Sequence, residues 1–246
     1  MKSSHRQWLK RVAALLEIPA PDPLRLLRRI EIMERDVMLP VKAVFIGMIS
    51  YSFLSTKWFG QTLSVLDVSV EMVQIIFWFY ILANVLFAAI LLMAERLPLA
   101  LVQWTVVTSS LVDGLLIAAM ALITGGLDSI LFWLFVVLIV RNAVSVPPGF
   151  SQLFLNFVIS LCYVLVAILD TSVMASLDDT TRKAFDLSPH EELGEPFVLR
   201  MAVLWLTAIC CYGAQVLLER QRLAVEEAEE FAAREGQLRS AGRLAA

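Results

Sequence analysis

The sequence predicts an all-α membrane protein: a polytopic bundle of six spans, followed by a charged cytoplasmic helix. Three observations support this fold class. The chain is 59% apolar and only 17% charged, whereas a soluble domain is near half apolar and about a quarter charged. Six apolar runs come close to the roughly 20 residues that a helix needs to cross a bilayer. The charges are concentrated in the terminal segments and in the loops between the runs.

Six apolar runs are the expected spans of the bundle. They are Leu39–Leu54, Met72–Met93, Leu97–Ile123, Leu127–Val146, Phe150–Leu169 and Phe197–Leu218. The chain therefore divides into an N-terminal segment over 1–38, a transmembrane domain over 39–218 and a tail over 219–246.

The N-terminal segment is basic, and its first part has the spacing of an amphipathic helix suited to an anionic inner leaflet. Prolines interrupt this helix. Pro23 is suited to the first position of a second helix, over Leu24–Met38, that leads into the first span. The segment either only sets the topology or makes a specific regulatory contact.

Lysine and arginine residues predict the orientation of the spans. They favour the cytoplasmic side of short loops. Fifteen of them lie in the termini and in the loops on the same side, and three lie in the opposite loops. We therefore expect a multi-pass protein of the inner (cytoplasmic) membrane with both termini in the cytoplasm. Arg141, at the end of the fourth span, is interpreted as one of the inner anchors.

Asp113 is the outstanding polar residue of the spans because it lies near the middle of the third one. A carboxylate at this depth costs at least ~2.5–3.5 kcal/mol, so we expect it to face the bundle interior. No Lys or Arg is expected at the same depth, which leaves Asn84 and Asn156 as its partners. These three residues form the candidate intramembrane sensing site, acting either as a structural hydrogen bond or as a proton- or ligand-responsive switch.

Several functional classes lack their signatures in this sequence. No phosphate-binding or dinucleotide-binding glycine motif is present. The only histidines, His5 and His190, are expected on opposite sides of the membrane and cannot share a metal ion. The composition also excludes a nucleic-acid binder. We therefore expect no catalytic residue, metal or nucleic-acid partner, and the lipid bilayer as the immediate partner.

The tail carries a heptad pattern. Its apolar row consists of Leu217, Ala224, Phe231, Leu238 and Ala245. The second row is weaker and partly polar, which is typical of a marginal coiled coil. Nothing in the sequence breaks the helix between the sixth span and the tail. We expect a parallel homodimer in which this seam transmits a signal; a solvated charged helix is the alternative.

The end of the tail resembles the run-in to the H-box of sensor histidine kinases. In that family a stretch L-x-x-x-G-x-L-A-A leads to the phosphoacceptor histidine. The matching residues are Leu238, Gly242, Leu244, Ala245 and Ala246. The resemblance implies the membrane module of a two-component kinase, ending just before that histidine. It also implies that ATP and Mg²⁺ bind in a missing kinase part, which phosphorylates a response regulator. This chain holds neither the histidine nor the ATP site, so its own enzymatic status stays open.

The turn after the third span resembles that of the RegB/PrrB group of redox-responsive kinases, which also have six spans. That group has a quinone-linked GGxxNPF motif here. This sequence offers Gly125, Gly126, Asp128 and Phe132, with other residues in place of the Asn and the Pro. The resemblance implies a candidate ligand turn and a quinone-linked signal. The alternative function is a stand-alone six-span protein: a small transporter or an adaptor for a separate kinase.

Overall fold

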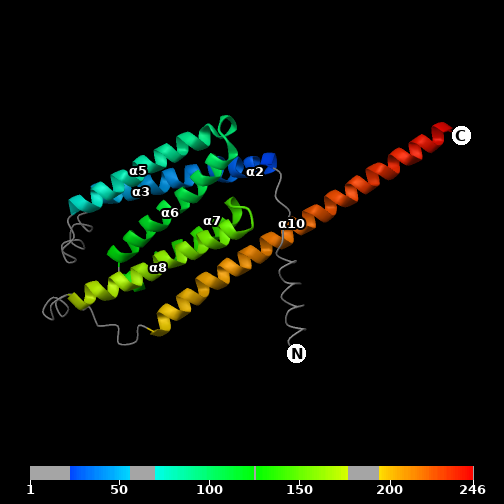
Figure 1. The fold of residues 1–246 in the computed structure, drawn as a ribbon. Coiled ribbons are helices and arrows are strands. Elements are labelled where there is room, and N and C mark those ends of the chain that lie inside the picture. The colour runs from blue at the N-terminus through cyan, green and yellow to red at the C-terminus, as the bar shows by residue number, and fades with distance from the viewer. Residues whose placement is uncertain (1–22, 56–69, 125, 177–193, 246) are drawn as a thin grey trace, which may run out of the picture. The chain divides into compact units, whose positions relative to one another are not determined.

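The computed structural model describes residues 23–55, 70–124, 126–176 and 194–245, and all regular structure in these residues is helical (Figure 1). The elements are α2 (Pro23–Ile30), η1 (Glu31–Met38), α3 (Leu39–Ser55), α5 (Val70–Leu92), η2 (Ala94–Arg96), α6 (Leu99–Ile123), η3 (Gly126–Asp128), α7 (Phe132–Ser145), α8 (Phe150–Ser176) and α10 (Gly194–Ala245). The predicted all-α class is confirmed for this part of the chain.

Among the described residues, four helices are long and apolar enough to cross a membrane. Their apolar stretches are Gln74–Leu92, Leu99–Ile123, Phe150–Ser172 and Pro196–Gln237. They correspond to the second, third, fifth and sixth predicted spans. The other two predicted spans correspond to α3, with 17 residues, and α7, with 14 residues. Both are shorter than the roughly 20 residues of a typical membrane helix, so the count of six stays a prediction.

The described residues fall into two units, one within residues 20–209 and one over residues 210–245. Within residues 20–209, α6 is the central helix, because it packs against α5, α7 and α8. Gly114 of α6 permits the close approach of α8. A Cβ atom at this position would lie 2.6 Å from Cδ1 of Ile159.

The first described segment is helical throughout, from Pro23 to Ser55, and contains a π-helical stretch, η1. The backbone N–H of Leu39 bonds the carbonyl of Glu34, five residues back. The stretch ends just before Pro40, whose ring would clash with the carbonyl four residues back in a regular α-helix. The helix predicted over Leu24–Met38 is therefore confirmed, with this local widening as a departure.

The helix α2 packs near the C-terminal end of α7. Leu26 and Ile30 are buried. The guanidinium of Arg29 donates from Nε to the carbonyl of Val144 at 2.7 Å and from Nη2 to that of Ala143 at 3.2 Å. A cation here complements the negative end of the α7 dipole. This half of the N-terminal segment thus makes specific contacts with the bundle. The amphipathic helix predicted before it lies outside the described residues.

The helix α10 continues for 52 residues, from Gly194 to Ala245. At 1.5 Å per residue it is about 78 Å long. The expected uninterrupted passage from the last span into the charged tail is therefore present. Along the predicted seam, Leu217, Ala224 and Phe231 are exposed. The side chains of residues 238 and 245 lie outside the described part of the structure, and the pairing of two copies stays a prediction.

Candidate functional site

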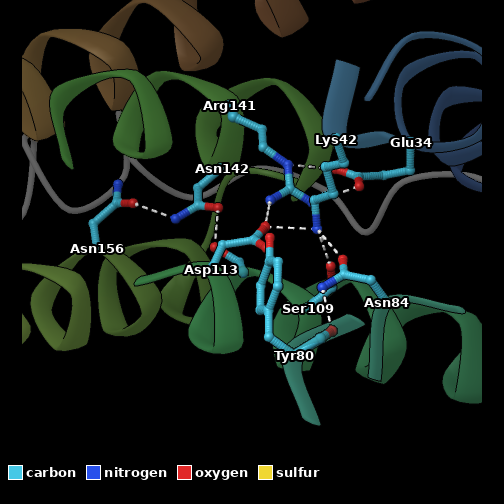
Figure 2. A network of polar contacts seen from close by, with 10 residues as sticks. Glu34, Lys42, Tyr80, Asn84, Ser109, Asp113, Arg141, Asn142 and Asn156 are labelled. Carbon is cyan, nitrogen blue, oxygen red and sulfur yellow. Dashed lines mark hydrogen bonds and ion pairs between the residues drawn. The ribbon is translucent and has the colours of Figure 1, made fainter. Parts of the chain in front are cut away.

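Four charged side chains meet inside the bundle: Glu34 of η1, Lys42 of α3, Asp113 of α6 and Arg141 of α7 (Figure 2). We call this group the charge cluster. Glu34, Asp113 and Arg141 are 2%, 7% and 6% exposed, and the side chain of Lys42 is 18% exposed. Two carboxylates face two cations, so the cluster is formally neutral. Because a buried charge without a partner is very costly, this balance is a condition for the bundle to form.

Asp113 is the acceptor at the centre of the cluster. Its Oδ2 accepts from Nζ of Lys42 at 2.6 Å and from Nη1 of Arg141 at 2.5 Å. Its Oδ1 accepts from the hydroxyl of Tyr80 at 3.0 Å. Both oxygens of this intramembrane carboxylate are therefore hydrogen-bonded, and its contacts join α3, α5 and α7 to α6.

Arg141 connects the two carboxylates. Its Nε and Nη2 donate to Oε1 and Oε2 of Glu34 at 3.2 and 2.6 Å, while Nη1 faces Asp113. The planar guanidinium fork is suited to such bidentate pairing, which adds geometric specificity to the charge attraction. Through Arg141, the π-helical segment η1 is fastened to the interior of the bundle.

Lys42 completes the cluster on the side of α5. Besides Asp113, its ammonium donates to Oγ of Ser109 at 2.5 Å and to Oδ1 of Asn84 at 3.4 Å. The amide of Asn84 in turn donates from Nδ2 to the carbonyl of Tyr80 at 3.0 Å. All three ammonium protons thus have acceptors, as Figure 2 shows.

The predicted sensing site is right in placing Asp113 in the interior and wrong in its partners. Asn84 contacts Lys42 and not Asp113. Asn156 accepts from Nδ2 of Asn142 at 3.4 Å and also does not contact Asp113. The true partners are two cations and a tyrosine.

A second, uncharged group of polar side chains lies between α6, α7 and α8. Ser110 donates to Oδ1 of Asn142 at 2.5 Å, and the Asn142 amide donates to Asn156. Nδ2 of Asn156 and both polar side-chain atoms of Gln152 are buried without a hydrogen-bond partner among the described residues. This group brings Asn156 near the cluster only indirectly.

Two predictions about charge are wrong for the same reason. Arg141 is not an inner anchor, because its guanidinium is buried between Glu34 and Asp113. Asp113 also has cations at its depth. The position of a residue along a helix fixes its Cα atom, whereas Lys and Arg side chains extend far from it. Lys42 within the first predicted span was the available signal, since an apolar run tolerates a lysine best when it has a partner.

The turn after α6 depends on Gly126, which has a φ of 56°. The backbone N–H of Leu127 donates to Oδ2 of Asp170 at 3.1 Å, and a Cβ atom on Gly126 would collide with this carboxyl group. The predicted tight glycine turn is confirmed at this position. Gly125 and the side chain of Asp128 lie outside the described residues.

Phe132, the last residue of the candidate ligand turn, belongs to the hydrophobic core. Its ring lies 5.3 Å from that of Tyr163, between centroids, and the guanidinium of Arg200 lies 5.6 Å from its centroid. The Asp170 carboxyl occupies the space against Gly126. Gly126 and Phe132 thus contact other parts of the bundle, and the quinone-linked signal stays a prediction.

Comparison with known protein families finds no family model that matches this chain, and comparisons with curated proteins and with solved structures find no match either.

Proposed function

We propose that this chain is the membrane sensing and transmission module of a two-component sensor histidine kinase. One observation carries the proposal. The helix α10 runs without a break from a candidate span into a charged heptad tail, and the end of that tail has the L-x-x-x-G-x-L-A-A pattern of an H-box run-in. Such a helix can deliver a movement of the bundle directly to a cytoplasmic kinase domain.

The proposal includes six spans, both termini in the cytoplasm of a bacterial cell and a parallel homodimer. The shorter α3 and α7 are its first and fourth spans. In this arrangement α2 lies at the inner surface. Without the buried Arg141, fourteen Lys and Arg residues lie in the predicted inner segments and three in the opposite loops, and this distribution supports the orientation.

The charge cluster is suited to be the element on which a signal acts. It fastens η1 to α7 through the Glu34–Arg141 ion pair and α7 to α6 through the Arg141–Asp113 ion pair. Near it, Leu138 of α7 and Ile159 of α8 belong to the same hydrophobic cluster as Leu204 and Ala208 of α10. A rearrangement of the ion pairs would therefore shift the part of α10 that packs in this cluster. A coupling free energy of about 1–3 kcal/mol is typical of such transmission.

The mass of the native gene product tests the kinase proposal. Membranes of the source cells would be probed on an immunoblot with an antibody against residues 170–196. We expect a band well above 27.5 kDa, the mass of these 246 residues, because the phosphoacceptor and ATP-binding domains must follow the tail. A band at 27.5 kDa would contradict the proposal.

The dimer seam is tested by cysteine cross-linking. In a variant without Cys162, Cys210 and Cys211, Phe231→Cys is expected to form an intermolecular disulfide readily, because a parallel seam places the same residue of both copies face to face. Ala233→Cys, on the opposite side of α10, is the matched control and should cross-link several-fold more slowly. Equal rates for both positions would mean that the tail is a solvated single helix.

A small transporter is the second candidate function, and the charge cluster is the observation that favours it. Intramembrane ionisable residues that face a bundle interior often mark substrate or ion pathways. The sequence alone indicated one such residue, and the structure adds Glu34, Lys42 and Arg141. A native mass of 27.5 kDa would make this candidate, or an adaptor for a separate kinase, the preferred one.

A further inference from the structure

The helices α2 and η1, residues 23–38, form a thin layer against α7 and the charge cluster, and we call this layer the lid. Of its side chains only Leu26, Ile30 and Glu34 are buried. The opposite face of the lid is open to the surroundings, since Leu24 and Ile32 are 76% and 47% exposed. An element with so few buried side chains opens at a lower free energy cost than the core of a bundle.

Two polar contacts hold the lid on α7. Arg29 donates to two backbone carbonyls at the end of α7, and the carboxylate of Glu34 accepts from the Arg141 guanidinium (Figure 2). The other two charged residues of the cluster lie outside the lid, on α3 and α6. Lifting the lid would therefore withdraw Glu34 from Arg141 and leave the other three charges in place.

The charge balance decides what can follow such a movement. With Glu34 withdrawn, Lys42 and Arg141 face only Asp113, so the interior carries one positive charge in excess. A buried charge without a partner is very costly. A monovalent anion restores neutrality, whereas a dianion such as sulfate would leave the cluster negative. An open lid therefore favours the entry of a monovalent anion.

The shape of the site favours a carboxylate with a short alkyl chain. The Nε and Nη2 atoms of Arg141 already hold both oxygens of one carboxylate, that of Glu34, in the bidentate geometry that suits this group. A cavity of about 270 Å³ borders Glu34, and Leu39, Ala43 and Ile46 are among its aliphatic lining residues. A few methylene groups can lie in this cavity beside the position of the carboxylate.

We propose that Arg141 is a binding site for a short-chain aliphatic monocarboxylate, and that Glu34 occupies this site as an internal competitor while the lid is closed. When the lid opens, the ligand's carboxylate accepts from Nε and Nη2 of Arg141, and its alkyl chain lies in the neighbouring cavity. Binding of the carboxylate and closure of the lid exclude each other. The site depends only on the lid and the charge cluster, so it stands or falls independently of the kinase proposal.

Cysteine labelling of the full chain in lipid nanodiscs tests the opening of the lid, with propionate as the probe ligand. The variants lack the three native cysteines. Val146→Cys lies in the same hydrophobic cluster as Leu26 and Ile30 of the lid, whereas Val166→Cys, equally buried, lies in a separate cluster. We expect propionate to raise the rate of labelling at residue 146 by a water-soluble maleimide at least threefold, with saturation, and to leave residue 166 within about 1.5-fold.

Propionamide, which has the same shape and no charge, is the control ligand and should have no effect on either rate. A response to propionamide as large as that to propionate would overturn the requirement for an anion. An unchanged rate at residue 146 with propionate, or an equal rise at both positions, would overturn the proposed lid.

Removing the internal competitor gives a second test of the site at Arg141. In the Glu34→Ala variant, propionate should raise the detergent concentration at half-unfolding in a saturable manner, because it takes the place of the missing carboxylate. The same variant with Arg141→Met should show no such rise, and neither should Glu95→Ala, since the Glu95 side chain is 76% exposed. Glu34→Ala without stabilisation by propionate would contradict the proposal. If Glu34→Ala does not fold, the labelling experiment, which retains Glu34, decides the question.

Discussion

Replacing Arg141 with glutamine is expected to lower the free energy of unfolding by about 3–5 kcal/mol, the cost of breaking a buried ion pair on one side. The substitution leaves the Glu34 carboxylate, 2% exposed, without its cation. It also leaves Asp113 with only Lys42 and Tyr80 as charged or hydrogen-bonded partners. Unfolding in mixed micelles with increasing denaturing detergent would measure this loss.

A double variant separates the loss of charge balance from the loss of a large side chain. Glu34→Gln together with Arg141→Gln leaves the Lys42–Asp113 pair and a neutral site, so it should recover much of the stability lost in the single variant. Arg96→Gln is the control because Arg96 is exposed, and it should change stability by no more than about 0.5 kcal/mol. A single Arg141→Gln variant as stable as the Arg96→Gln control would show that the charge cluster does not form.

Much of the helical framework follows from the sequence, because the length of an apolar run and the glycine or proline residues near its ends are local properties. The predicted end of the third span at Ile123 and the predicted start of the fifth at Phe150 coincide with the bounds of α6 and α8. The first span was predicted to within one residue of α3. At each of these ends the hydropathy changes together with a glycine or proline nearby, so one pattern marks both the span and its limit.

The charge cluster could not be predicted in the same way. Glu34 and Arg141 are 107 residues apart, and no local pattern links a charge in the N-terminal segment to one near the end of a later helix. Positive charges near span ends are usually anchors, so the ordinary interpretation of Arg141 concealed its role. The pairing of two carboxylates with two cations depends on the packing of the helices against one another, which the sequence does not state.

The fourth predicted span shows a different limit of hydropathy. It was expected over Leu127–Val146, whereas α7 extends from Phe132 to Ser145. The residues before α7 are apolar in part but form the 3-10 turn η3, where the hydroxyls of Thr124 and Ser129 lie 2.7 Å apart in a hydrogen bond. Hydropathy records how readily residues leave water and does not distinguish a buried turn from the first turn of a helix.

Replacing Gly126 with alanine is expected to lower the free energy of unfolding by about 2–4 kcal/mol, for two additive reasons. A φ of 56° is unfavourable for any residue with a Cβ atom. In addition, the new methyl group would displace the buried Asp170 carboxyl group. The displacement breaks the hydrogen bond from the Leu127 N–H, which then has no acceptor in a buried turn. The same detergent titration measures this loss.

Gly149→Ala is the matched control for this turn. Gly149 lies in the short connection before α8, has no positive φ, and a Cβ atom there would meet nothing within 4 Å. Its replacement should change stability by no more than about 0.5 kcal/mol. Near-equal stability of the Gly126→Ala and Gly149→Ala variants would mean that Asp170 does not anchor the turn. A large loss at Gly126 alone would show that one carboxylate on α8 holds the turn between α6 and α7, independently of the charge cluster.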